Sequence, residues 1–205
     1  MLKLQDISKS FDDKCLFSNL NFTLDIGNTL AIIGPSGSGK STLLKIIAGL
    51  IDPNSGEIFL SDINITNLPT YKRNIGMVFQ DNQLFSHLDV KGNIEFGLRM
   101  HKWPKAQRTR RVKELLDLVG LTGFEDRKIH ELSGGESKRI ALARSLAPNP
   151  AVLLLDEPLT GLDEKLHDQL MFDLKLVLNE TKTTTILVTH DKSEATEVSN
   201  ETVQL

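Results

Sequence analysis

A glycine-rich segment, residues 34–42, constrains the fold of this chain more strongly than any other feature. It reads Gly-Pro-Ser-Gly-Ser-Gly-Lys-Ser-Thr and matches G-x-x-x-x-G-K-[ST], with the apolar run Leu30–Ile33 before it and the helical run Leu43–Ala48 after it. The glycines let backbone N–H groups turn inward around an anion, and the helix N-terminus adds the positive end of its dipole. This context predicts a phosphate-binding loop, in which Lys40 reaches the β- and γ-phosphates and Ser41 holds Mg²⁺.

Hydrophobic patterning indicates an α/β fold. Three continuously apolar runs are typical of central parallel strands that helices cover on both faces: Leu30–Ile33, Val152–Leu155 and Ile186–Val188. Helical patterns lie between these runs, and strands that alternate with helices indicate the α/β class. The segment Leu20–Ile26 alternates apolar and polar side chains, which predicts a strand of an antiparallel sheet. Residues from about Leu84 to Ala147 show no convincing strand, so we expect a helical lobe inserted into the α/β core.

Composition excludes several classes of protein. The 205 residues carry 24 Lys and Arg against 27 Asp and Glu, whereas a protein that binds nucleic acid through its phosphates usually has a basic excess. The lone Cys15 permits no intrachain disulfide, no apolar run approaches the ~20 residues of a membrane span, and the N-terminus has no signal-peptide stretch. We therefore expect a soluble, cytoplasmic chain without a nucleic-acid partner, although another subunit could still hold it at a membrane.

Two carboxylates end the second apolar run. Asp156 and Glu157 follow Val152–Leu155 directly, and adjacent negative charges do not stabilise a strand end. The carboxyl ends of parallel strands line the ligand crevice, so we expect Asp156 to support the Mg²⁺ held by Ser41 and Glu157 to orient or deprotonate a water. The alternative is that the pair simply opens a polar loop. His190 follows the third apolar run and is a candidate to hydrogen-bond the γ-phosphate.

A second glycine turn decides between families, because a phosphate loop alone leaves enzymes from kinases to GTPases open. Leu132-Ser133-Gly134-Gly135-Glu136 is a Ser-Gly-Gly turn that opens a helix, which predicts a second anion-binding terminus. Here the chain resembles the ATP-binding subunits of ABC transporters, whose signature is Leu-Ser-Gly-Gly-Gln. A P-loop kinase has no use for this segment.

The resemblance covers essentially the whole chain and adds further motifs. Gln80 is similar to the family's Q-loop glutamine, Thr160–Asp163 to its D-loop and His190 to its switch histidine. Phe11 lies where the family places an aromatic side chain that stacks on adenine.

This resemblance implies an architecture. It consists of a RecA-like P-loop core with an antiparallel β subdomain, about residues 1–83 and 148–205, and a helical subdomain that carries the signature, about 84–147. Together these form a single ATPase domain over 1–205. Two copies face each other head to tail, so that Ser133 and Gly135 of one subunit touch the γ-phosphate bound by the other.

Motifs and resemblance together assign the site residues. The expected catalytic residues are Glu157, His190 and Gln80, and the expected Mg²⁺ ligands are Ser41, Gln80 and Asp156. The expected ATP-binding residues are Phe11, Gly34, Pro35, Ser36, Gly37, Ser38, Gly39, Lys40, Ser41, Thr42, Ser133, Gly134, Gly135, Glu136 and Asp163.

Two positions depart from the family pattern. Glu136 replaces the usual glutamine; its carboxylate can accept hydrogen bonds from ribose hydroxyls, but its charge near a triphosphate is unfavourable. Phe11 replaces the more usual tyrosine, which keeps the stacking face and loses a hydroxyl.

Two further segments, 68–80 and 84–98, are similar to importer ATPases that serve sugars, polyamines, iron, thiamine or molybdate. Many of these carry a C-terminal regulatory domain, which we expect to be absent because the chain ends 15 residues beyond His190. Leu84, Phe85 and Leu88 either tuck into the helical lobe or line a groove for a helix of the membrane subunit.

The implied function is ATP hydrolysis that powers solute import through transmembrane subunits at the cytoplasmic face of the membrane. The implied partners are these permease subunits, a second copy or a homologous ATPase subunit, and a substrate-binding protein. An exporter ATPase stays open as an alternative. So does a soluble ABC ATPase acting on DNA or the ribosome, although the coiled coils, zinc modules and basic arms usual in that group are not visible in the sequence.

Overall fold

The predicted central strands pair with one another in one parallel sheet. The computed structural model describes residues 1–12 and 14–205, and the sheet has the order β6-β7-β8-β3-β9. Its members are β3 (Thr29–Ile33), β6 (Ile75–Val78), β7 (Val152–Asp156), β8 (Thr184–Thr189) and β9 (Glu201–Gln204). Strands β7 and β8 are buried along their whole length, and β8 lies parallel to both β3 and β7. The prediction of buried parallel strands is confirmed.

A second sheet is antiparallel and has the order β2-β1-β4-β5. It consists of β1 (Leu2–Phe11), β2 (Lys14–Leu24), β4 (Ser55–Leu60) and β5 (Ile63–Asn64). The predicted alternation holds up to Leu24, but Ile26 is 76% exposed and lies in a turn. The strand ends early because Gly27 adopts a φ of 80°, in the left-handed region, and the backbone reverses between Asp25 and Asn28.

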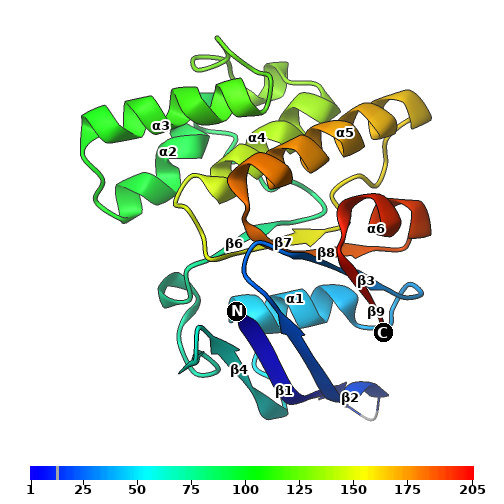
Figure 1. Cartoon of the computed structure of the whole chain (residues 1–205). Helices are drawn as coiled ribbons and strands as arrows, with labels where there is room; N and C mark the ends of the chain where they lie inside the picture. Colours follow the sequence, from blue (N-terminus) through cyan, green and yellow to red (C-terminus); the bar gives the residue numbers. More distant parts are fainter. Residues whose placement is uncertain (13) are drawn as a thin grey trace. The chain divides into compact units, whose positions relative to one another are not determined.

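One helix, α1 (Lys40–Ala48), supplies the core between these sheets. Leu43, Leu44, Ile46 and Ile47 are fully buried in a cluster with side chains of β1, β3, β4, β7 and β8. Figure 1 shows α1 between the two sheets, while α6 (Lys192–Val198) packs on β3 and β8. These elements belong to one compact unit, the first unit, which comprises Met1–Met77, Ala151–Glu157 and Lys182–Leu205.

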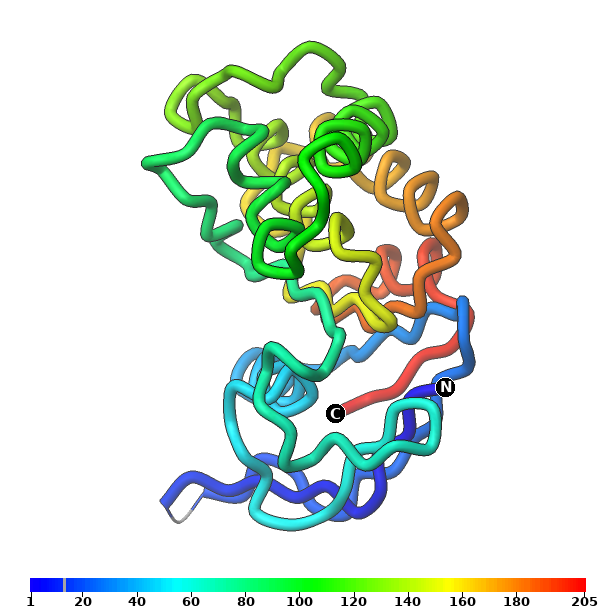
Figure 2. Tube along the Cα trace, turned by 90° about the vertical axis from the view of Figure 1, so that its left-hand side faces the viewer, coloured from blue at the N-terminus to red at the C-terminus, as the bar shows by residue number. Residues whose placement is uncertain are grey.

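The second unit comprises Val78–Pro150 and Pro158–Thr181 and is helical. Its helices are α2 (Val90–Met100), α3 (Lys105–Leu118), α4 (Gly134–Leu146) and α5 (Glu164–Thr181). It also contains the short 3₁₀ turn η2 (Ile129–Glu131), whereas the 3₁₀ turn η1 (Thr70–Lys72) belongs to the first unit. In Figure 2, α2 and α3 form the green coils beside α4, and α2 contacts both α3 and α4. As predicted, residues 84–147 contain helices and no strand. Among the described residues, no helix is both long and apolar enough to cross a bilayer.

A buried arginine closes the C-terminal end of α1. The Arg73 side chain donates hydrogen bonds to the carbonyl oxygens of Ile46 and Ile47 in the last turn of α1, at 2.9 and 3.0 Å. It also donates to the carbonyls of Thr66 at 2.6 Å and Leu68 at 2.8 Å. Burial lowers the pKa of the guanidinium, which the nearby Asp52 partly opposes. Arg73 thus adds donors to the last turn of α1, where the Ile46 carbonyl also accepts from the N–H of Gly49 at 3.1 Å.

We expect Arg73→Leu to lower the free energy of unfolding by about 2–5 kcal/mol, because four backbone carbonyls lose a hydrogen bond from a buried donor. Urea unfolding midpoints measure this, with Lys72→Met at the exposed neighbouring position as the control that changes stability by less than about 0.5 kcal/mol. Equal midpoints for both variants would show that the guanidinium contributes nothing.

Candidate nucleotide site

The glycine-rich loop connects β3 to α1, and its geometry needs glycine. Gly39, the residue before the first helical residue, adopts a φ of 100°, and a Cβ there would lie 3.1 Å from the Phe17 ring. With glycine in the N-cap position, no side chain of that residue caps the first-turn N–H groups of α1. The Ser38 hydroxyl oxygen is buried and has no hydrogen-bond partner among the described residues. Open amides and a buried hydroxyl suit a phosphate group.

The ammonium group of Lys40 lies inside this loop. It donates to the carbonyl oxygens of Gly34 at 2.8 Å and Pro35 at 2.9 Å, and the residue is only 5% exposed. These bonds use two of its three N–H groups. The arrangement therefore holds a positive charge at the centre of the loop, where a phosphate would be bound.

Ser41 and Asp156 meet across the sheet edge. Ser41 Oγ donates a 2.7 Å hydrogen bond to Asp156 Oδ1 at the end of β7. Burial raises the pKa of Asp156, and Glu157 adds to the rise, whereas the Ser41 hydrogen bond, Lys45 and Lys40 oppose it. A hydroxyl and a buried carboxylate are hard oxygen donors of the kind that Mg²⁺ prefers, and a cation would relieve the cost of this buried charge.

Glu157 is held in a strained conformation beside His190. Its φ of 45° is unusual for a residue with a side chain, and its N–H donates to the carbonyl of Val188 at 3.0 Å. His190 Nδ1 lies 3.7 Å from Glu157 Oε2. The corner around His190 is fixed because Thr189 Oγ1 donates to Glu194 at 2.6 Å and accepts from the N–H of Asp191 at 3.0 Å.

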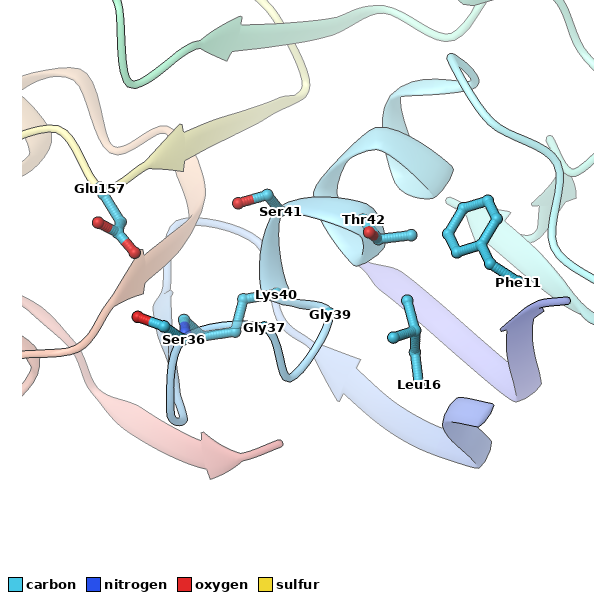
Figure 3. Close-up of a pocket in the computed structure, with 9 residues that line it drawn as sticks. All are labelled: Phe11, Leu16, Ser36, Gly37, Gly39, Lys40, Ser41, Thr42 and Glu157. Atoms are coloured by element: carbon cyan, nitrogen blue, oxygen red, sulfur yellow. The ribbon is translucent and has the colours of Figure 1, made fainter. Parts of the chain in front are cut away.

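The glycine-rich loop and Glu157 line a pocket of about 370 Å³. Figure 3 shows Phe11 and Leu16 at one end, Glu157 at the other, and the glycine-rich loop between them. Phe11 is 46% exposed, which leaves ring surface for stacking. All lining residues belong to the first unit: Phe11, Leu16, Ser36, Gly37, Gly39, Lys40, Ser41, Thr42 and Glu157. An apolar end and a cationic, amide-rich end match a nucleoside polyphosphate.

The Ser-Gly-Gly turn begins α4 in the second unit, as predicted. Ser133 Oγ accepts from the N–H of Glu136 at 3.3 Å, and Glu136 Oε2 accepts from the N–H of Ser133 at 2.7 Å. The hydrogen bonds from Ser133 are the main reason that the pKa of Glu136 is lowered. Glu136 Oε1 also lies 3.8 Å from Arg127, whose guanidinium stacks on Phe124 at 3.7 Å. The Glu136 carboxylate thus caps the N-terminus of α4, and Arg127 supplies a positive charge close to it.

Three other predicted residues also lie in the second unit. Gln80 is exposed in the turn after β6. Asp163 Oδ1 accepts from the N–H of Leu166 at 3.1 Å and so caps the first turn of α5. Phe85 is half-buried, with its ring centroid 4.6 Å from that of Phe96.

Sequence reasoning missed Lys138. Its ammonium donates to the carbonyls of Pro158 at 2.7 Å and Thr160 at 3.1 Å, and so holds the segment before Asp163 against α4. No local sequence pattern predicts this contact, because the acceptors of the Lys138 hydrogen bonds are backbone atoms.

We expect Asp156→Asn to raise the melting temperature of the nucleotide-free protein at pH 7 by at least about 2 °C, since an asparagine still accepts from Ser41 without a buried charge. Because the pKa of Asp156 is raised in the folded protein, the folded protein binds a proton at Asp156 more tightly than the unfolded chain does. The parent therefore loses stability as the pH rises from the ordinary pKa of Asp through the raised pKa of Asp156. The difference between parent and variant therefore shrinks at pH 5.

The control for that experiment is Asp126→Asn, at an exposed position, which should behave as the parent at both pH values. An Asp156→Asn protein that is less stable than the parent at pH 7 would contradict the account.

Comparison with known proteins agrees with this site. The family model described as ABC transporter matches residues 17–160. The sulfate/thiosulfate import ATP-binding protein CysA of Synechococcus elongatus is 47% identical over 202 residues, which are 98% of this chain and 59% of that protein. The putrescine transport ATP-binding protein PotG of Escherichia coli is 43% identical over 195 residues, 95% of this chain and 52% of that protein. The chain thus spans little more than half the length of both relatives.

A solved structure also matches closely. The dimeric structure of an ATP-binding cassette in a post-hydrolysis state, bound to ADP and Pi, shares 34% sequence identity at a TM-score of 0.86, over 100% of this chain and 94% of that one. The predicted fold, an α/β P-loop core with an antiparallel sheet and a helical signature region, is confirmed. With its phosphate loop, acidic strand end and signature turn all in the expected structural context, this chain belongs to the ABC transporter family.

Proposed function

We propose that this chain is the ATP-hydrolysing subunit of a membrane importer. The observation that carries the proposal is the Ser41–Asp156 hydrogen bond at 2.7 Å, which joins the phosphate loop to the carboxylate that precedes Glu157, so that two hard oxygen donors suited to Mg²⁺ lie together. The resemblance to the ATP-binding cassette whose structure is bound to ADP and Pi supports ATP as the ligand. The named relatives are import or transport ATP-binding proteins, which favours import over the exporter and soluble alternatives.

We assign tasks in hydrolysis to residues in and near the pocket. Phe11 stacks on the base, and the loop amides and Lys40 bind the triphosphate. Ser41 and Asp156, with Gln80 as the further ligand that we propose, would hold Mg²⁺, which would supply positive charge to the triphosphate. Glu157 orients the attacking water and accepts its proton, and His190, 3.7 Å from Glu157, donates a hydrogen bond to the γ-phosphate.

The site is completed by a second subunit. The segment from Ser133 to Glu136 opens α4 with Ser133 and Gly134 exposed, and it provides a helix N-terminus suited to an anion. In the head-to-tail dimer that we propose, this turn and Asp163 contact the nucleotide held by the phosphate loop of a second copy or a homologous subunit. Hydrolysis then opens the dimer and moves permease subunits at the cytoplasmic face of the membrane, which receive solute from a substrate-binding protein.

The sharpest test of hydrolysis is Glu157→Gln, which keeps the shape of the side chain and removes its basicity. We expect kcat for ATP to fall about 100-fold or more while ATP still binds, so that a dimer accumulates with ATP and not with ADP. Gel filtration and a phosphate-release assay measure both effects. Glu197→Gln, on the exposed face of α6, is the matched control, and near-normal turnover of Glu157→Gln would refute the role.

A further inference from the structure

Arg144 binds the loop that follows Gln80. It lies in the last turn of α4, and its guanidinium donates to the carbonyl oxygens of Gln83 at 2.7 Å and Asn82 at 2.9 Å. All of these residues belong to the second unit. No part of the nucleotide site described above uses Arg144.

The bonded loop is a tight and strained turn. The N–H of Asn82 donates to the carbonyl of Phe79 at 3.0 Å, which makes Gln80 and Asp81 the central residues of a β-turn. Asn82 and Gln83 then adopt φ values of 56° and 46° in the left-handed region. Two consecutive residues with side chains in this region are unfavourable on their own, so the surrounding contacts must hold them there.

Those contacts come from two helices. Beyond the turn, the Phe85 ring lies 5.1 Å from the Arg144 guanidinium. Asn93 of α2, which is fully buried, accepts from the N–H of Phe85 at 2.8 Å and donates to its carbonyl at 3.1 Å. Burial lowers the pKa of Arg144, so the guanidinium pays a desolvation cost that its two hydrogen bonds offset. The segment after Gln80 is therefore attached to α4 at Asn82 and Gln83 and to α2 at Phe85.

Helix α4 connects the Ser133 turn at its N-terminus to Arg144 in its last turn. It begins at the Ser133 turn and reaches Arg144 eleven residues later, a rise of about 17 Å along a rigid helix. We propose that Arg144 is a positioning residue that couples Gln80 to the signature turn, so that a displacement of Gln80 moves Ser133 with it. This inference rests on the proposed function, because it needs Gln80 and Ser133 to contact nucleotide.

A double-mutant cycle on the purified full chain tests the coupling. Arg144→Met keeps the aliphatic length against Phe85 and removes both hydrogen bonds. We expect it to lower kcat for ATP about tenfold with little change in KM, but by less than about twofold when Gln80 is already alanine. Arg144→Lys, which retains a charged donor, should recover part of the loss.

Arg111→Met is the matched control. Arg111 donates to the carbonyls of Leu146 and Ala147 at the end of α4, at 3.2 and 3.3 Å, in the same unit but away from the Gln80 turn. Its effect on kcat should be the same with Gln80 or alanine at position 80. If Arg144→Met lowers kcat equally in both backgrounds, Arg144 only stabilises the fold and the inference is wrong.

Amide hydrogen exchange separates this inference from the proposed function, since it needs nucleotide binding and no turnover. Adding a non-hydrolysable ATP analogue with Mg²⁺ should slow exchange at residues 80–83 and 134–137 in the parent, and at 80–83 alone in Arg144→Met. Slowing at both segments in Arg144→Met overturns the coupling. A parent protein that shows the paired response but hydrolyses no ATP contradicts the proposed function and leaves the coupling supported.

Discussion

One hydrogen bond, from Ser41 Oγ to Asp156 Oδ1, joins segments that are 115 residues apart in the sequence. Sheet pairing makes it possible, because Ile33 lies opposite Thr189 and Asp156 lies opposite Val188 at the same edge of the parallel sheet. The loop after β3, the carboxylates after β7 and the histidine after β8 therefore converge. Every proposed step of hydrolysis depends on this convergence, and the pairing of buried strands sets it.

The site is built at a cost to stability. Asp156 is a buried carboxylate whose pKa burial raises, and Glu157 beside it has a strained backbone. A fold selected for stability alone would place neither there. The helical ends show the opposite tendency: Arg73 satisfies the last carbonyls of α1, and Arg111 satisfies those of α4. Arginines thus fix the ends of the two helices that begin at the phosphate loop and at the signature turn.

Local patterns in the sequence predicted the features that depend on local chemistry. The buried strands, the phosphate loop at Gly34–Thr42 and the helix that begins after Ser133 all follow from short segments, and each is present in the structure. The prediction that Ile26 belongs to the strand is wrong, because the turn at Gly27, with its left-handed φ, ends the strand at Leu24. The bonds of Lys138 and Arg144 could not be predicted, since their acceptors are backbone carbonyls, which every residue has. The use of Glu136 as a helix cap could have been predicted from Ser133 three residues before it.

The central claim is that each nucleotide site contains the phosphate loop of one chain and the signature turn of another. Cysteine cross-linking tests it directly, because Cys15 is the only native cysteine and can be replaced by serine. One chain carries Ser36→Cys, and a second chain with a different tag carries Gly134→Cys. Both positions are exposed, and a Cβ at Gly134 meets no atom within 4 Å. The account predicts a disulfide-linked heterodimer with Mg²⁺ and a non-hydrolysable ATP analogue, and none with ADP. Failure of the two tagged chains to link with the ATP analogue, or equal linking with ADP, would contradict it.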